Sequence, residues 1–531
     1  MEFRKDLFAN ERDDDLNEVG QPTQRQDALG HVTGRSRFFD DHAVPGMLHM
    51  KFARSPHHHA RIRSLDVREA AQTPGVVRVL TSEDVPKKVH TLLILLDLGP
   101  DDEPPLAFDK VRYRGEPVAA VIAETEAAAT AGAAKVRVDY EPLPAVFDVE
   151  ESLAPGAPLV NEFHGRNWYD YDGHDFQKIR FGDVERAFRE ADHVVEERYQ
   201  MTPIEHAPTE TGGCIAAPDT AGRYVCYTNT QALFFSLETA ARILEVPSNR
   251  LHFVGGTVGG GFGGKVDSVH EPLAILGAML TQRPVRSAYS RAEEMQVSSP
   301  RGAERFYIKD GVMNDGRIVA RYARIYFDSG AYSRLSPYGA VKAAAHMPGP
   351  YWIPNVWVDA RCVYTNRTPS SAMRGFGVTG ADFALEVQMD KLARLVGMDP
   401  MEFRILNAYR DGDMKAHRRV TKNAALIECV QAAAQLTDWP LAERFRAMSS
   451  TRDGGGERAK ITPTPAPTPG AGNGAPRRMP PPAGAGVAAA AGPEAGADPS
   501  PAAPAASTAP AARTPMAGRG RMSSLLGTRR R

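Results

Sequence analysis

Short apolar segments alternate with amphipathic ones over roughly the first 150 residues. VVRVL at 76–80 and PVAAVIA at 117–123 are rich in β-branched and small apolar residues, which predicts strands. ETEAAATAGAAKV has the composition of a helix, and the strand-like VRVDYEPL follows it. We therefore predict that residues 27–148 form a first unit in which strands and helices are mixed.

A second series of alternating segments begins near FGDVERAFREADHVVEERYQM. Asp183 is placed to cap a helix, and VVEERYQM has the alternation of a strand. YVCYTN, RLHFVGG and RIVARYARIYFDS predict further strands, while SLETAARIL and EPLAILGAMLTQ predict helices. No internal repeat is visible, so we expect an α+β fold with a second domain over residues 165–440.

The segment LEVQMDKLARLVG has helical periodicity with a clear division between faces. We expect its core-facing stripe to consist of Met389, Leu392 and Leu395. Glu386 and Asp390 lie off this stripe, and we interpret them as a pair in solvent or at the edge of the packing.

Composition changes abruptly near residue 451. From there to residue 531 the chain has no Phe, Trp, Tyr, Cys or His, and Ala, Pro and Gly dominate. Such a segment cannot bury enough apolar surface to offset chain entropy, so we predict a disordered tail over residues 451–531. A natural flexible tail and an out-of-frame reading of GC-rich DNA both fit this composition.

Charge and cysteine usage exclude several classes of function. The net charge of −1 gives no electrostatic reason to expect nucleic acid or a membrane as partner. The four cysteines are widely separated, without the C-x-x-C pairs of zinc or iron–sulfur sites, and they suit a reducing cytoplasm. The N-terminal arm, residues 1–26, is charged, and we expect neither a secretory signal nor a transmembrane helix.

The stretch GGGFGGKV, residues 259–266, has three possible interpretations. It matches most of a P-loop, but Val266 stands where a hydroxyl would bind Mg²⁺. It fits G-x-G-x-x-G, but the next predicted strand ends in Arg291 rather than in the acid that binds a ribose. In the third interpretation, the glycines let several backbone N–H groups approach an anionic cofactor. A glycine-rich turn without a ligand also stays open on spacing alone.

GGTVGGGFGGK also resembles the cofactor-binding loop of the xanthine dehydrogenase and aldehyde oxidase family, the molybdenum hydroxylases. TNTQALF at 228–234 resembles the Thr-Gln segment of that family, and residues 370–413, from SSAMRGFG onward, resemble its second cofactor segment and the helix after it. HVTGRSRFFDD, PGMLHMKFARSPHHHARI and YRGEPVAAVIAET resemble its a/b hammerhead domain. The resemblance runs from about residue 27 to about residue 439 in the order of the family.

The resemblance implies a hammerhead domain followed by the first of two molybdopterin-binding domains. It also implies the cofactor, molybdopterin cytosine dinucleotide or a related molybdopterin. Gln231 would hydrogen-bond an oxo ligand of molybdenum, and Arg374 would offer its backbone N–H near the metal. Phe376 would stack on a planar substrate. The full set of implied cofactor residues is Gln231, Gly260, Gly261, Phe262, Gly263 and Arg374.

Several positions depart from the family pattern. Val266 replaces an acid that contacts the substrate in purine-oxidising relatives, and Lys342 stands where Arg is frequent. These two positions and Phe376 are the predicted substrate contacts. The second cofactor domain and its catalytic glutamate are not in this sequence, so we expect no catalytic residue here.

The resemblance implies a hydroxylase subunit that oxidises an aldehyde or N-heterocycle with oxygen from water. Electrons would then pass to a [2Fe–2S] subunit and an FAD subunit. The alternative is a truncated, non-catalytic chain. Two further polar groups could suggest chemistry: Glu205, His206 and Glu210 in PIEHAPTE, and the histidines at 57–59. We interpret the first as a hydrogen-bonded structural group, and we expect no metal at the second because alternate strand residues face opposite ways.

Overall fold

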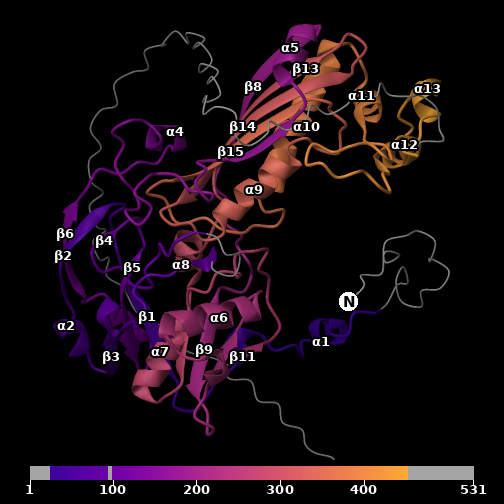
Figure 1. Ribbon diagram of the computed structural model, residues 1–531. Coiled ribbons are helices and arrows are strands. Elements are labelled where there is room, and N and C mark those ends of the chain that lie inside the picture. The colour runs from indigo at the N-terminus through magenta and orange to yellow at the C-terminus, as the bar shows by residue number, and fades with distance from the viewer. Residues whose placement is uncertain (1–23, 94–98, 452–531) are drawn as a thin grey trace, which may run out of the picture. The chain divides into compact units, whose positions relative to one another are not determined.

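The computed structural model describes residues 24–93 and 99–451 (Figure 1). Most of the predicted N-terminal arm lies outside these ranges, as does the predicted tail apart from Thr451. Within these ranges, no helix has both the length and the apolar character that a membrane crossing requires. Helices and strands are mixed throughout, which confirms the expected α+β class.

A seven-stranded sheet joins the two predicted domains. Its order is β11-β10-β9-β12-β1-β5-β3, and β1 pairs in parallel with β12 so that Leu48 lies opposite Val285. Strand pairing therefore crosses the predicted boundary between residues 148 and 165. The strands are β1 (Leu48–Arg54), β3 (Val76–Leu80), β5 (Pro117–Ala123), β9 (Gly213–Pro218), β10 (Tyr224–Thr228), β11 (Leu251–Gly255) and β12 (Val285–Ala288).

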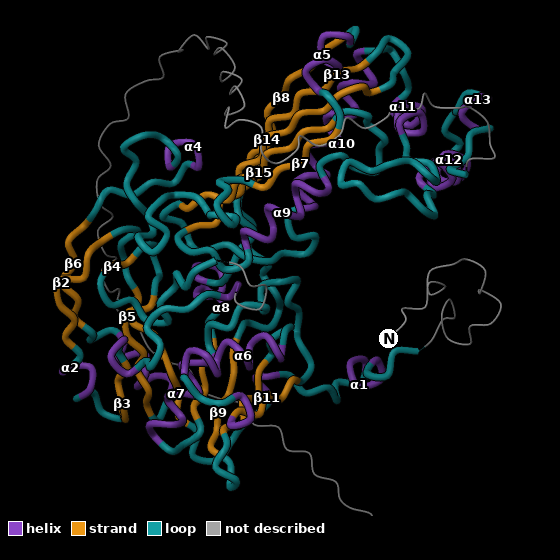
Figure 2. Tube along the Cα trace, in the orientation of Figure 1, coloured by secondary structure: helices purple, strands orange, loops and turns teal. Residues whose placement is uncertain are grey.

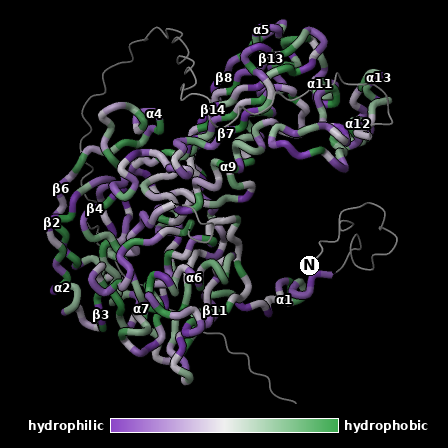
Figure 3. The backbone as a smooth tube through the Cα atoms, viewed as in Figure 1, coloured by the Kyte–Doolittle hydropathy of each residue, from purple (hydrophilic) through white to green (hydrophobic). Residues whose placement is uncertain are grey.

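Helices cover both faces of this sheet. α6 (Leu233–Leu244) and α7 (Glu271–Thr281) pack on each other, and α7 lies on β9, β10 and β12. Hydrophobic residues run along α7, as Figure 3 shows. α3 (Glu126–Ala133) lies on the other face, because Gly132 contacts Val121 whereas Gly277 of α7 contacts the adjacent Ile122. A smaller sheet, β4-β2-β6, consists of β2 (Ala60–Asp66), β4 (Lys110–Val111) and β6 (Arg137–Pro142).

A five-stranded sheet carries the second core (Figure 2). Its order is β7-β15-β14-β13-β8, with β14 and β15 parallel and the other neighbours antiparallel. α9 (Ser336–His346) and α10 (Val378–Leu395) cover one face, and α5 (Val184–Glu190) packs against Ala320 on the other. The strands are β7 (Gln177–Phe181), β8 (His193–Met201), β13 (Glu304–Val312), β14 (Ile318–Gly330) and β15 (Val356–Tyr364).

The local helix predictions are mostly confirmed. Asp183 caps α5 by accepting from the N–H of Arg186 at 3.0 Å. Met389 and Leu392 are fully buried, but Leu395 is 45% exposed, so its assignment to the core stripe is wrong. Leu395 is the last residue of α10.

Glu386 and Asp390 lie at a packing edge, as expected, and both bind Arg404 of α11 (Pro400–Asn407) at 2.8 Å. The remaining helices are α1 (Ala28–Val32), α2 (Arg68–Ala71), α4 (Val149–Ser152), α8 (Arg291–Val297), α11 (Pro400–Asn407), α12 (Leu426–Leu436) and α13 (Glu443–Arg446).

Candidate functional site

The glycine-rich loop, residues 259–266, leaves the edge strand β11 and turns back on itself. The N–H of Gly264 donates to the carbonyl of Gly261 at 2.8 Å, which closes the turn. Glu210 fixes the start of the loop, because its carboxylate accepts from the N–H of Gly259 at 2.8 Å while its own N–H donates to the carbonyl of Gly259. Backbone and carboxylate contacts thus hold the start and the turn of the loop.

Close packing explains why this loop needs glycine. A Cβ on Gly261 would lie 2.4 Å from Oε1 of Gln231, and one on Gly263 would lie 2.5 Å from the carbonyl oxygen of Ala372. Gly263 also has a φ of 105°, a conformation that L side chains rarely adopt. The glycines therefore allow three chain segments to approach at this point.

Gln231 sits at the turn between β10 and α6 and binds this loop through its amide oxygen. Its Oε1 accepts from the N–H of Gly263 at 2.9 Å and of Lys265 at 3.3 Å. This network assigns the amide orientation and turns Nε2 away from those donors. Nε2 has no hydrogen-bond partner among the residues that the structure describes, and it remains able to donate to a ligand.

The second predicted cofactor segment, residues 370–377, packs directly on the first. The N–H of Arg374 donates to the carbonyl of Phe262 at 2.8 Å. This N–H therefore closes the contact between the two loops, and its expected position near the metal stays a prediction. His206 supports the same contact, since its buried Nε2 donates to the carbonyl of Ala372 at 2.9 Å while its ring packs on Gly264. Burial lowers the pKa of His206 and favours the neutral ring.

Lys265 decides against the P-loop interpretation. Its ammonium group is 2.8 Å from the Glu210 carboxylate, and the residue is only 5% exposed. A phosphate-binding lysine must reach its ligand, whereas this one is enclosed within the fold. The dinucleotide interpretation also fails, because that fingerprint opens directly into a helix and α7 begins only at Glu271.

The polar groups of PIEHAPTE act within the fold, as expected. Glu205 accepts from the hydroxyl of Ser298 at 2.7 Å, and Glu210 binds Lys265 and the N–H of Phe39. At residues 57–59, the His59 ring donates to the carbonyl of Pro144. No group of three or more potential metal-binding side chains occurs within residues 24–93 and 99–451.

The predicted substrate contacts lie on neighbouring elements. Phe376 precedes α10 and packs against Tyr338 of α9, with ring centroids 5.5 Å apart. The ammonium group of Lys342 lies 5.7 Å from the centre of the same Tyr338 ring. Val266 and Phe376 both pack partly buried against one apolar cluster. Tyr338, which sequence reasoning missed, brings Lys342 and Phe376 together.

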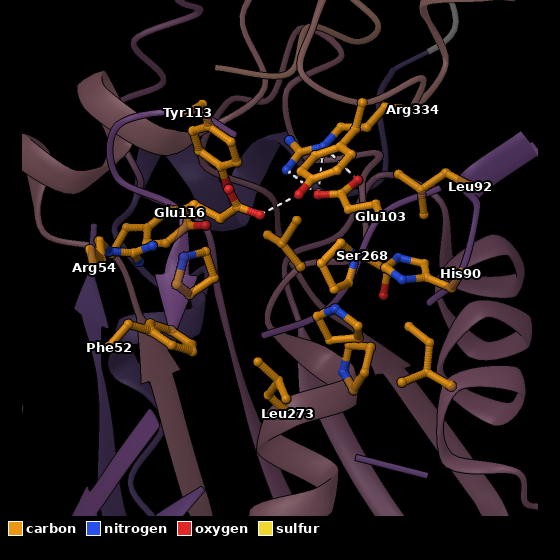
Figure 4. Close-up of a pocket in the computed structure, with 18 residues that line it drawn as sticks. Phe52, Arg54, His90, Leu92, Glu103, Tyr113, Glu116, Ser268, Leu273 and Arg334 are labelled. Atoms are coloured by element: carbon orange, nitrogen blue, oxygen red, sulfur yellow. Dashed lines mark hydrogen bonds and ion pairs between the residues drawn. The ribbon is translucent and has the colours of Figure 1, made fainter. Parts of the chain in front are cut away.

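A separate cavity of about 40 Å³, room for a few water molecules at most, is lined by residues that include Ser268 and Arg334 (Figure 4). Glu116 is fully buried beside it and accepts from the hydroxyl of Tyr332 and the N–H of Arg112. Burial raises the pKa of Glu116 to about 7. The cavity is too small for a substrate.

Comparisons with known proteins identify the family. The family model for the molybdopterin cofactor-binding domain matches residues 168–408, and the model for the aldehyde oxidase and xanthine dehydrogenase a/b hammerhead domain matches residues 33–144. The nicotinate dehydrogenase large molybdopterin subunit of Eubacterium barkeri is 35% identical over 422 residues, which cover 79% of this chain and 96% of that subunit. This chain belongs to the molybdenum hydroxylases.

Other molybdenum hydroxylases extend further than the matched region. A probable xanthine dehydrogenase subunit of Bacillus subtilis is 34% identical over 75% of this chain but over only 52% of its own length. The aldehyde oxidoreductase of Desulfovibrio gigas superposes with a TM-score of 0.73 at 30% identity, covering 79% of this chain and 47% of that chain. The chain therefore spans about half the length of these two relatives and almost all of the nicotinate dehydrogenase subunit.

The loops of this hydroxylase chain fit an anionic cofactor. Within the described residues, the N–H groups of Gly260, Gly261 and Phe262 have no hydrogen-bond acceptor. Gly260 and Phe262 have φ values of 95° and 52°, and successive N–H groups in such turns can surround an anion. Nε2 of Gln231 adds a fourth donor. These are the donors that an anionic oxo or dithiolene group requires.

Proposed function

We propose that this chain is the molybdopterin-binding large subunit of a molybdenum hydroxylase whose remaining parts lie on other polypeptides. The observation that carries this proposal is the group of four donors, from Gln231 and residues 260–262, that have no acceptor among the described residues. Two exposed aromatic side chains lie in the segments that carry these donors: Phe262, 48% exposed, in the glycine-rich loop, and Phe234, 86% exposed, three residues after Gln231. A cofactor and a second protein surface would cover these apolar side chains.

When bound, the cofactor would supply two-electron oxidation of a C–H bond with oxygen from water. We propose molybdopterin cytosine dinucleotide or a related form. The contribution of this chain is to hold the cofactor: Gln231 donates from Nε2, and the N–H groups of Gly260, Gly261 and Phe262 bind anionic oxygen or sulfur. Because they are fixed before the ligand arrives, these donors need little reorganisation to bind it.

The substrate side favours a planar molecule. Phe376 and Tyr338 provide aromatic surface for stacking, and Lys342 places a positive charge beside them. We propose an aldehyde or an N-heterocycle as substrate, and the cation makes a heterocycle with a carboxylate the first to test. The similarity to a nicotinate dehydrogenase subunit supports the same choice.

We propose that the catalytic base and the other side of the site come from a second polypeptide. The carboxylates of PIEHAPTE are unsuited to this role: Glu210 binds the buried Lys265, and Glu205 accepts from Ser298. The match to the nicotinate dehydrogenase large subunit covers 96% of that subunit. This similarity supports a site that is divided between chains. A [2Fe–2S] subunit and an FAD subunit would carry the electrons away in the cytoplasm.

The proposal is tested by purifying the full chain alone and together with the proteins that co-purify from its own cells. Molybdenum is measured by mass spectrometry, and dye reduction is assayed with nicotinate, an aromatic aldehyde and an uncharged N-heterocycle. We expect the complex to contain molybdenum and to turn over, and the isolated chain to do neither. A complex without molybdenum would refute the function. An isolated chain that retains the metal and turns over would refute the division of the site.

A further inference from the structure

Arg334 is a buried cation between β14 and α9, at the end of the cavity that Figure 4 shows. Its side chain is 2% exposed, and it donates to the Glu103 carboxylate at 2.8 Å. Its backbone has a φ of 40°, which is unusual for a residue other than glycine. Such a conformation persists where the surroundings fix it, so the position of this guanidinium group is tightly constrained.

Asp267 is the second acid that faces this cation, and it directly follows the glycine-rich loop. Its carboxylate lies 3.5 Å from the Arg334 guanidinium and is 1% exposed. Oδ1 accepts from the hydroxyl of Ser371 at 2.7 Å, and Oδ2 accepts from the hydroxyl of Ser299. Ser371 lies three residues before Arg374, whose N–H binds the carbonyl of Phe262. One carboxylate thus connects the end of the first loop to the start of the second.

Burial of this carboxylate is costly, which constrains its partners. Burial raises the pKa of Asp267, and the Arg334 cation and the two serine hydroxyls oppose that shift. A charged group in a low-dielectric interior is stabilised only while its partners stay in place. The carboxylate therefore favours the arrangement of chain segments in which Arg334, Ser299 and Ser371 all reach it. Two segments 104 positions apart, at Asp267 and Ser371, are fixed relative to each other in this way.

We propose that Asp267 is a positioning residue that holds residues 259–266 and 370–377 in register as one cofactor-binding surface. The effect on cofactor binding rests on the proposed function. The connection of the two loops through Asp267 is a property of this chain alone. Loss of the Asp267 carboxylate would let the two loops move independently. The donors at residues 260–262 would then no longer be aligned with the rest of the site.

The experiment compares Asp267→Asn and Ser371→Ala with a matched control, Asp310→Asn. Asp310 is fully buried and binds the fully buried Arg321 at 2.8 Å, but it lies within the five-stranded sheet and contacts neither loop. The variants are made in the full chain within its complex. Hydrogen exchange is followed in peptides covering both loops, and molybdenum per chain is measured by mass spectrometry.

We expect Asp267→Asn to accelerate exchange in both loops by about tenfold or more, as befits the loss of a charge-assisted hydrogen bond. Ser371→Ala should accelerate exchange in residues 370–377, and both variants should retain less molybdenum than wild type. Asp310→Asn should lower the melting temperature but leave loop exchange and molybdenum content unchanged. If Asp310→Asn changes the loops as much, or if Asp267→Asn leaves them unchanged, the proposal is overturned. If wild type holds no molybdenum, the proposed function fails while the exchange data still decide the role of Asp267.

Discussion

Replacing Gly261 with Ala tests the relation between the glycine-rich loop and Gln231. The added Cβ would lie 2.4 Å from Oε1, 2.5 Å from Cδ and 2.9 Å from Cγ of Gln231. Non-bonded carbon contacts are comfortable at about 3.5 Å or more, so the Gln231 amide must move by about 1 Å. No positive φ strains Gly261, so steric contact alone causes the effect.

The displacement has a calculable cost. Oε1 of Gln231 would lose its contacts with the N–H groups of Gly263 and Lys265. Each hydrogen bond contributes about 0.5–1.5 kcal/mol, so the pair amounts to about 1–3 kcal/mol. Because about 1.4 kcal/mol corresponds to a factor of ten, cofactor affinity should fall roughly 5- to 150-fold. Nε2 of Gln231, the proposed donor to the cofactor, would move with the oxygen.

Gly256 offers a matched control in the same connection. A Cβ there would meet only the carbonyl oxygen of Arg37, at 4.0 Å, so Gly256→Ala should be nearly neutral. Both variants are made in the full complex and compared by molybdenum content and by dye-reduction kinetics. We expect the Gly261 variant to lose most of its molybdenum and the Gly256 variant to retain it. Equal molybdenum retention by the two variants would show that cofactor binding does not depend on the packing of Gln231 against Gly261, and would refute the reasoning.

Three further predictions concern charge and substrate. Burial raises the pKa of Glu116 to about 7, so its proton stabilises the fold at low pH, and this stability is lost as pH rises from about 4.5 to about 7. The loss of unfolding free energy is on the order of 3 kcal/mol. Glu116→Gln keeps partners for Tyr332 and Arg112, and it should reduce the difference in unfolding free energy between urea melts at pH 5 and pH 8. An unchanged difference between the two pH values would count against the burial of that acid. Phe376→Ala should raise KM for aromatic substrates about 2- to 10-fold by loss of stacking. Lys342→Ala should raise KM for nicotinate more than for an uncharged heterocycle, and equal effects would argue against a carboxylate contact.

The sequence alone determined the class of fold and indicated where the candidate site lies. Runs such as PVAAVIA encode strands because β-branched residues suit an extended backbone, and β5 forms there. The order and spacing of the glycine-rich loop, the Gln231 segment and residues 370–377 were enough to indicate the family. Val266 correctly argued against a P-loop, although the decisive reason, the enclosure of Lys265 by Glu210, is a tertiary contact.

Only the tertiary structure decided which polar groups are free and which are engaged. The N–H of Arg374 lies in the expected segment, but its hydrogen bond to the carbonyl of Phe262 could not be read from the sequence. The connection of Asp267 to Ser371 has no signal in either local sequence. Local patterns report backbone periodicity and burial, because these depend on near neighbours in the chain. Hydrogen-bond partners are chosen by long-range packing, which brings distant segments together and requires each buried polar group to find a partner there.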